Sequence, residues 1–224
     1  MQFTSSYGAG ITPPKLTLAD INQFHFIRSQ TFHGVENWGE DDLNKAIKTL
    51  EAFFKELGNE FSRQYAIKTY GEALLNLNKH ALPDLAGEMF TNSNDSIALR
   101  TSRFPDKTYK GEIYAEVNVR SGRLLVHIDD NGLGINPFVE AKLFTRNPEE
   151  GIPDPKYRTK KQVRETDKKI LICGKEGEGL AQLKNFMSLL GGAYDYINKG
   201  HLKGATFWYS VPLSSIASPL EDVR

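Results

Sequence analysis

The apolar positions in the N-terminal half of the chain recur mostly at helical spacing. Three helices are predicted, over about 18–32, from Asp42 to Gly58, and over about 60–82. The second has one apolar stripe with spacings of three and four, made of Leu43, Ile47, Leu50, Phe54 and Leu57. Gly58 and Pro83 are expected to end the second and third helices, because glycine favours the left-handed C-terminal conformation and proline interrupts a helix.

The C-terminal half shows strand patterns. Apolar and polar residues alternate over 113–128, on both sides of a Ser-Gly turn, which predicts a β-hairpin with one buried face. A helix that begins near Gly179 is expected next. Two strands, 193–197 and 205–211, are predicted to close the fold.

Two long connections separate these patterns. Residues 83–111 have weak periodicity, and we expect an irregular segment there with one short strand near 97–101. Its turn-forming residues include Asn92, Ser93, Asn94, Asp95, Pro105 and Asp106. The second connection, 136–176, is basic in its second half. A loop of this length inside a compact domain is usually functional, so we interpret it as a lid.

Composition is that of an ordinary globular protein. The chain has 224 residues, of which 39% are hydrophobic and 25% charged. Its net charge of zero argues neither for nor against a nucleic-acid partner. The single cysteine, Cys173, excludes an internal disulfide framework and fits a reducing compartment. No apolar run approaches the roughly 20 residues that cross a bilayer, and no signal pattern opens the chain, so we expect a cytoplasmic protein.

The predicted helix over 60–82 carries the first candidate for chemistry. Glu72, Asn76 and Lys79 are four and three residues apart and therefore project from one face. An amide oxygen suits Mg²⁺, a hard cation, and a lysine can neutralise phosphate. Taken alone, however, the trio fits a solvated helix face at least as well.

The sequence IDDNGLGI, residues 128–135, is the second candidate. Asp130 ends the predicted hairpin and is followed at once by Gly132 and Gly134. A carboxylate at this place can accept a hydrogen bond from an exocyclic amine such as that of adenine, and glycines let the backbone approach a flat ligand. The alternative is a tight turn that only reverses the chain.

The third candidate is GKEGEGL, residues 174–180, at the start of the predicted C-terminal helix. Backbone amides at a glycine-rich helix start form an anion site, because the first-turn donors lack partners within the helix. No Gly-Lys-Ser/Thr follows, so the stretch is not a P-loop, and its spacing excludes a dinucleotide fingerprint.

In this order, the three stretches resemble the GHKL (Bergerat-fold) ATPases, which include DNA gyrase, heat-shock chaperones, sensor histidine kinases and mismatch-repair ATPases. The resemblance covers about residues 60–213. Within the superfamily, GEALLNLNKHA (71–81) looks most like the N box of NarL-type sensor histidine kinases. The C-terminal run from GEGL through GATF to a final proline also looks like a kinase.

The resemblance implies ATP and Mg²⁺ as ligands. Glu72 would be the catalytic carboxylate, Asn76 the Mg²⁺ ligand, Lys79 a phosphate contact, and His80 part of the pocket. Asp130 would recognise the adenine amine. The remaining residues implied around the nucleotide are Gly132, Gly134, Ile135, Gly177, Gly179, Leu180 and Thr206.

The resemblance also implies the architecture. The fold would be a two-layer α/β sandwich, with a mixed sheet and helices on one face. We expect an N-terminal arm and helical hairpin over 1–58, an ATP-binding domain over 59–213 with its lid at 136–176, and a tail over 214–224.

Two functions stay open at this point. One is a histidine-kinase-like ATPase that transfers phosphate to a protein partner, such as a response regulator, or hydrolyses ATP. The other is an ATP-dependent switch of the anti-sigma or chaperone kind, without kinase activity. A homodimer through the N-terminal helices is a further expectation, and a nucleic-acid partner is not expected.

Overall fold

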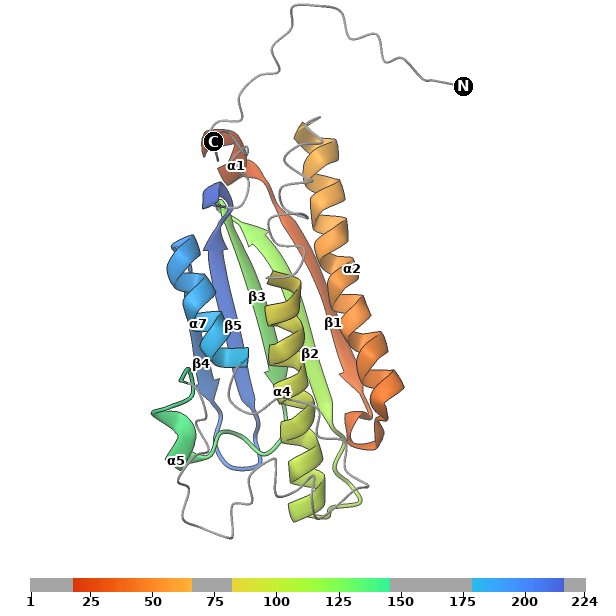
Figure 1. Ribbon diagram of the computed structural model, residues 1–224. Coiled ribbons are helices and arrows are strands. Elements are labelled where there is room, and N and C mark those ends of the chain that lie inside the picture. The colour runs from red at the N-terminus through yellow and green to blue at the C-terminus, as the bar shows by residue number, and fades with distance from the viewer. Residues whose placement is uncertain (1–17, 66–81, 146–178, 216–224) are drawn as a thin grey trace, which may run out of the picture.

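The chain folds into two layers, a sheet and a set of helices packed on one of its faces (Figure 1). The computed structural model describes residues 18–65, 82–145 and 179–215. Within them, five strands lie in the order β1-β2-β3-β5-β4, with the bounds β1 Phe26–His33, β2 Glu112–Arg120, β3 Arg123–Asp130, β4 Ala193–Asn198 and β5 Ala205–Pro212. The helices are α1 Leu18–Gln23, α2 Glu40–Tyr65, α4 Leu82–Arg103, α5 Pro137–Glu140 and α7 Gly179–Leu190, with 3-10 turns at Val35–Asn37 and Leu213–Ser215.

The predicted two-layer α/β sandwich is confirmed. The expectation of a mixed sheet is not met, because the four strand pairings within the described residues are all antiparallel. Antiparallel neighbours are joined by short hairpins here, as between β2 and β3 and between β4 and β5.

The β2–β3 hairpin forms as its alternating pattern predicts. Every second side chain of both strands is buried, and Val117 pairs with Val126 at the middle. Ser121 and Gly122 make the turn with φ of 53° and 71°, the left-handed conformation that matches strand twist in a two-residue loop. The hairpin therefore delivers Asp130 to the end of β3 on the buried face.

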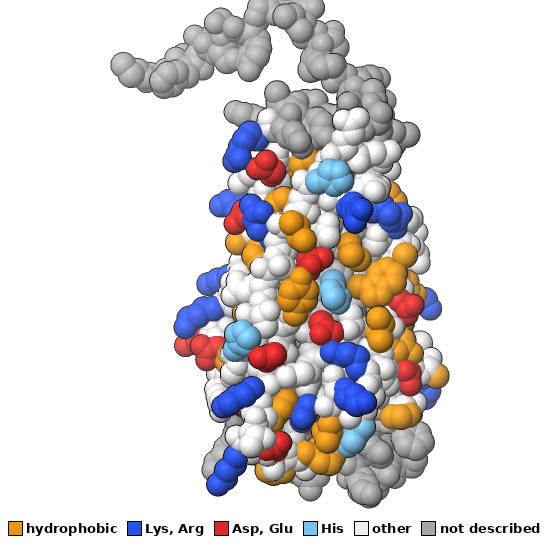
Figure 2. Space-filling model, turned by 180° about the vertical axis from the view of Figure 1, so that it is seen from behind, with side chains coloured by type: hydrophobic (Ala, Val, Ile, Leu, Met, Phe, Trp, Pro, Cys, Tyr) orange, Lys and Arg blue, Asp and Glu red, His pale blue; other side chains and the backbone are white. Residues whose placement is uncertain are grey.

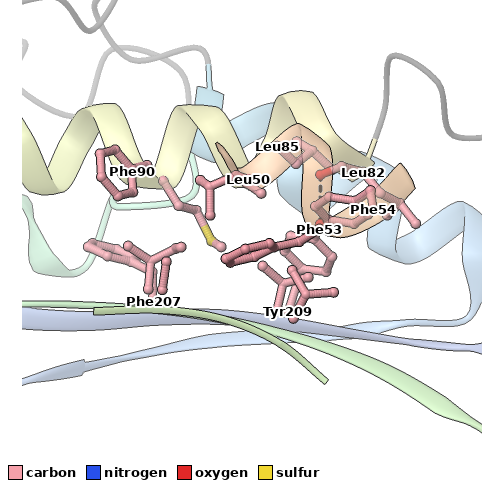
Figure 3. Packing of buried hydrophobic residues seen from close by; sticks show 14 of the residues in the cluster. Leu50, Phe53, Phe54, Leu82, Leu85, Phe90, Phe207 and Tyr209 are labelled. Carbon is pink, nitrogen blue, oxygen red and sulfur yellow. Dashed lines mark hydrogen bonds between the residues drawn. The ribbon is translucent and has the colours of Figure 1, made fainter. Parts of the chain in front are cut away.

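The core lies between this face and the helices. Figure 3 shows Leu50, Phe53 and Phe54 of α2 and Phe90 of α4 lying over Phe207 and Tyr209 of β5. The Tyr209 hydroxyl, fully buried, donates a 2.7 Å hydrogen bond to the Leu82 carbonyl at the start of α4. A buried hydroxyl needs such a partner, so this bond fixes where α4 begins over the sheet.

The opposite face of the sheet is free of helices among the described residues. Figure 2 shows acidic, basic, histidine and apolar side chains intermixed on this side of the molecule. Tyr114 of β2 and His127 of β3 are partly exposed there and meet edge to face, with ring centroids 5.8 Å apart. This face has the polar alternation of a sheet that contacts water on one side.

The helix predicted over 18–32 is wrong beyond Gln23. Residues 26–33 form β1, an edge strand that pairs with β2 through eight residues. Phe26 and Phe32 are buried while Ile27 is 54% exposed, so Ile27 does not continue a helical stripe. Strand pairing overrides the weak local helical spacing.

The predicted connection over 83–111 is wrong for most of its length. Residues 82–103 form α4, and Pro83 is its second residue, a position where the missing amide donor is tolerated. Gly58 likewise does not end α2, which continues to Tyr65. Helix packing against the core outweighs the local preferences of these residues.

The described part of the predicted N-terminal arm belongs to the same core as the rest. Phe24, Leu43, Leu50 and Leu57 are buried in one cluster with the apolar residues of α4 and the sheet. The β1 strand and α2 thus extend both layers of the sandwich.

Candidate functional site

Asp130 is the centre of the candidate site. It is the last residue of β3, and its side chain is 1% exposed. Its Oδ1 accepts hydrogen bonds from the Gly132 amide at 2.8 Å and the Ser96 hydroxyl at 3.3 Å, and the Ala205 amide lies at 3.4 Å. Its Oδ2 is buried and has no hydrogen bond of good geometry among the described residues; the Ser93 hydroxyl, buried and also unbonded there, is near enough to lower the pKa of Asp130. Because buried polar atoms are nearly always satisfied, this oxygen has the character of a ligand acceptor.

The electrostatics of Asp130 agree with this geometry. Burial raises the pKa of its carboxyl from 3.8 to about 6, and the Gly132 amide and the Lys199 ammonium oppose that shift. The carboxylate therefore stays ionised at neutral pH while it is poorly solvated. Perturbed groups of this kind are enriched at functional sites.

The turn after Asp130 requires its glycines. A Cβ at Gly132 would lie 2.4 Å from Ser96 Oγ and 2.8 Å from the Ile97 amide nitrogen in α4. Gly134 has φ of 84°, and a Cβ there would lie 2.5 Å from the Gly200 carbonyl oxygen. Packing against α4 and the β4–β5 hairpin accounts for both positions.

Ile135 continues the turn. Its amide donates to Asn198 Oδ1 at 3.3 Å, and its carbonyl accepts from Asn198 Nδ2 at 3.2 Å. The Asn198 side chain thus holds the start of the predicted lid against the end of β4.

The middle of α4 carries a run of buried polar side chains, and the helix contacts Asp130 through the Ser96 hydroxyl. Ser93, Asn94 and Asp95 are all at most 2% exposed, which is rare for such residues in a helix. Glu88 and Asn92, one turn apart, are partly buried on the same helix. Sequence analysis missed this group because the same residues are turn formers.

A signal for this group was present in the sequence. Glu88, Asn92 and Asp95 have the four-and-three spacing that Glu72, Asn76 and Lys79 have. The two runs lie 16 positions apart, and α4 is the one that the structure describes beside Asp130.

The start of α7 lies against Glu88. A Cβ at Gly179 would be 2.6 Å from Glu88 Oε2, so the carboxylate touches the first residue of the helix. Leu180 packs on the core beside it. The structure therefore brings β3, α4 and α7 together, while residues 71–81 and 174–178 of the predicted site lie outside the described residues.

The structure places Thr206 away from the Asp130 carboxylate. Thr206 pairs with Asp129 in the sheet, and its hydroxyl donates to Asp129 Oδ1. Successive strand residues point to opposite faces, so the β5 residue beside Asp130 is Ala205, which offers an amide and no hydroxyl. The role of Thr206 at the adenine stays a prediction.

Several predicted site residues lie outside the described residues. They are Glu72, Asn76, Lys79, His80 and Gly177, together with most of the lid. Their roles stay predictions. Of the lid, the structure describes only residues 136–145, which include α5.

We find no second candidate site among the described residues. No group of three or more His, Cys, Asp or Glu side chains there could hold a metal ion. A groove of about 490 Å³ at the far end of β1 and β2 is lined by residues such as Arg28, Glu60 and Arg120, and none of the site residues borders it. No described helix is long and apolar enough to span a membrane.

The chain is similar to a number of solved structures, and two of them are histidine kinases. The Mycobacterial sensor histidine kinase MprB is 16% identical, with a TM-score of 0.38, over 63% of this chain and 73% of that one. The histidine kinase domain of the Erythrobacter litoralis EL346 blue-light activated kinase is 16% identical, with a TM-score of 0.38, over 76% and 65%. Full-length ShkA in complex with AMPPNP is 24% identical, with a TM-score of 0.27, over 44% and 16%.

The other two comparisons gave nothing. No protein-family model and no curated protein matches the chain. Because the three TM-scores are below 0.5, the functional argument rests on the residues around Asp130.

Proposed function

We propose that the chain binds Mg-ATP as a histidine-kinase-like ATPase domain, with Asp130 accepting a hydrogen bond from the adenine amine. The observation that supports the proposal is Asp130 Oδ2, a buried acceptor that no described residue bonds with good geometry. A ligand N–H that donated to this oxygen would offset the free-energy cost of burying it without a hydrogen bond. A base that presents a carbonyl at this place would meet a carboxylate and be rejected.

For the phosphate end we propose α4 and the start of α7. Asn92 would supply an amide oxygen to Mg²⁺, which takes one or two protein oxygens and completes its shell with phosphates and waters. The amides at the start of α7 would contact phosphate oxygens.

We assign to Glu88 the role of catalytic carboxylate that the sequence analysis gave to Glu72. Its carboxylate touches Gly179 at the start of α7, and Asn92 is one turn further along α4. A carboxylate at this place can orient or deprotonate the nucleophile that attacks the γ-phosphorus. That nucleophile is water in hydrolysis, or a side chain of a separate protein, such as a response regulator or another regulatory protein, in transfer.

An ATP-dependent switch without turnover is the second candidate. The contact between Glu88 and Gly179 favours it, because the contact joins the site to the helix that follows the predicted lid. ATP that reorganised this contact would alter the surface around α7 whether or not it was cleaved.

Two measurements test the proposal. Calorimetric titration of the full chain with Mg-ATP is expected to show binding that Asp130→Asn abolishes and that Asp129→Asn, its neighbour on the other face, retains. Near-wild-type affinity in Asp130→Asn would refute the adenine assignment. Incubation with γ-labelled ATP then separates the classes, since free phosphate or labelled protein indicates an enzyme and intact bound ATP indicates a switch.

A further inference from the structure

Arg100, near the C-terminal end of α4, joins two loops that are distant in sequence. Its Nη1 donates to the carbonyl oxygens of Asn131 and Leu202, both at 2.6 Å. Its guanidinium carbon lies 3.9 Å from the centre of the Tyr109 ring. One side chain therefore connects α4, the turn after Asp130 and the β4–β5 hairpin.

The turn is also held from the side of β2. Asn131 Oδ1 accepts from the Glu112 amide at 2.9 Å and from the Tyr109 hydroxyl at 3.1 Å, and Asn131 Nδ2 donates to the Lys110 carbonyl at 2.8 Å. Every polar atom of the Asn131 side chain is thus used within the protein. Asn131 therefore anchors the turn through both its amide oxygen and its amide nitrogen.

The β4–β5 hairpin covers the turn from the other side. The Leu202 amide donates to the Leu133 carbonyl at 3.0 Å, and Leu202 has φ of 59°, a rare conformation for leucine. A Cβ at Gly204 would lie 2.0 Å from the Asp130 carbonyl oxygen. The backbone at Asp130 is therefore enclosed between α4 and the hairpin, and Arg100 lies where they meet.

We propose that Arg100 is a positioning residue, which fixes the Asn131–Gly134 turn against the hairpin and so holds the Asp130 carboxylate in its orientation toward the adenine end of the nucleotide. The inference rests on the proposed function of Asp130. Arginine suits the task because its planar guanidinium stacks on Tyr109 while it donates charge-assisted hydrogen bonds to both carbonyls. Lysine would keep the charge and lose the stacking.

The test uses the full chain and two variants of this residue, Arg100→Met and Arg100→Lys. Arg123→Met is the matched control, because Arg123 lies at the opposite end of β3 and bonds Ser210 through its Nε at 2.9 Å. Calorimetry measures the affinities for Mg-ATP and for tripolyphosphate. Competition against Mg-ATP measures the affinity for adenosine. Urea unfolding verifies that each variant is folded under the conditions of binding.

In Arg100→Met, the affinities for Mg-ATP and adenosine are expected to fall about tenfold, as the loss of charged hydrogen bonds predicts, while that for tripolyphosphate stays unchanged. Arg100→Lys is expected to recover part of the loss, and Arg123→Met to lose nothing. Unchanged adenosine affinity in Arg100→Met overturns the proposal. An equal loss for tripolyphosphate, or an equal loss in Arg123→Met, does so too, because either indicates a general structural role.

Amide hydrogen exchange without nucleotide keeps this inference separate from the function on which it rests. The Leu133 and Leu202 amides are expected to exchange faster in Arg100→Met than in the wild type, and unchanged exchange refutes the positioning role. If wild-type protein binds no Mg-ATP, the proposed function fails, and the inferred effect on adenine affinity fails with it, whatever the exchange shows.

Discussion

Asp129 and Asp130 are consecutive residues of β3, yet their carboxylates lie on opposite faces of the sheet. The Asp129 carboxylate is partly exposed and bonds the Lys199 ammonium at 3.0 Å and the Thr206 hydroxyl. The Asp130 carboxylate is buried under α4 and keeps one unpartnered oxygen. Strand alternation thus places one of two identical side chains in a partly exposed, paired environment and the other in a buried one.

The affinity for ATP is expected to fall in mild acid. The pKa of Asp130 in the free protein is about 6. Because Oδ1 accepts from protein donors, a proton on the carboxyl would sit on Oδ2, the oxygen proposed to accept from the adenine amine. At about pH 5 roughly a tenth of the sites are ionised, so the affinity is expected to be about tenfold lower than at neutral pH. Calorimetry with Mg-ATP across this range measures it. Affinity that is constant down to about pH 5 would contradict the assigned acceptor.

Asp130→Asn is expected to stabilise the fold while it removes binding. Burial raises the folded-state pKa from 3.8 to about 6, so the stability associated with this group is complete below the unfolded value and is lost as pH rises through about 6. The ionised carboxylate therefore costs the folded protein about 3 kcal/mol above that pH. We expect the variant to recover about 1–2 kcal/mol at neutral pH, because its amide also lacks a partner.

Urea unfolding at neutral and mildly acidic pH measures this effect. The gain is expected to disappear in acid, where the wild-type carboxyl is already neutral. Asp129→Asn is the control and should change stability in the opposite direction, because it removes the ion pair with Lys199. A loss of stability in Asp130→Asn at neutral pH would contradict the predicted cost of burying the ionised carboxylate.

The parts of this fold that could be predicted are those with a local pattern. The β2–β3 hairpin alternates strictly, its turn has Ser121 and Gly122, and it led directly to Asp130. The helix α7 begins after a glycine-rich run and ends before Gly191. In each case local preference and tertiary packing agree.

The parts that could not be predicted are those where packing overrides local preference. Asn92, Ser93, Asn94 and Asp95 favour turns in isolation, yet α4 holds them in helical conformation against β3. One of the residues that argued against a helix, Asn92, is thus the proposed Mg²⁺ ligand. Conflict between local and global preference is expected at functional sites.

Gly179→Ala is expected to destabilise the protein although alanine is the better helix former. The new Cβ would lie 2.6 Å from Glu88 Oε2 and 3.2 Å from Glu88 Cβ, so the carboxylate must move. Crowding of this kind typically costs about 1 kcal/mol or more. In a Glu88→Ala background the same substitution is expected to be neutral or stabilising. Urea unfolding of the four proteins gives the coupling energy, and an equal effect in both backgrounds would show that the two residues do not touch.

Asn92→Ala and Asn76→Ala together decide which helix holds the metal. Both residues follow a glutamate by four positions, and Asn92 lies on α4, which packs on β3 beside Asp130. We expect Asn92→Ala to reduce the Mg²⁺-dependent part of ATP affinity about tenfold, since one ligand oxygen is lost, and Asn76→Ala to leave it unchanged. Titrating ATP with Mg²⁺ and with a chelator measures that part in each variant. The reverse result would return the metal to the helix predicted over 60–82 and leave the buried polar group of α4 with a structural role only.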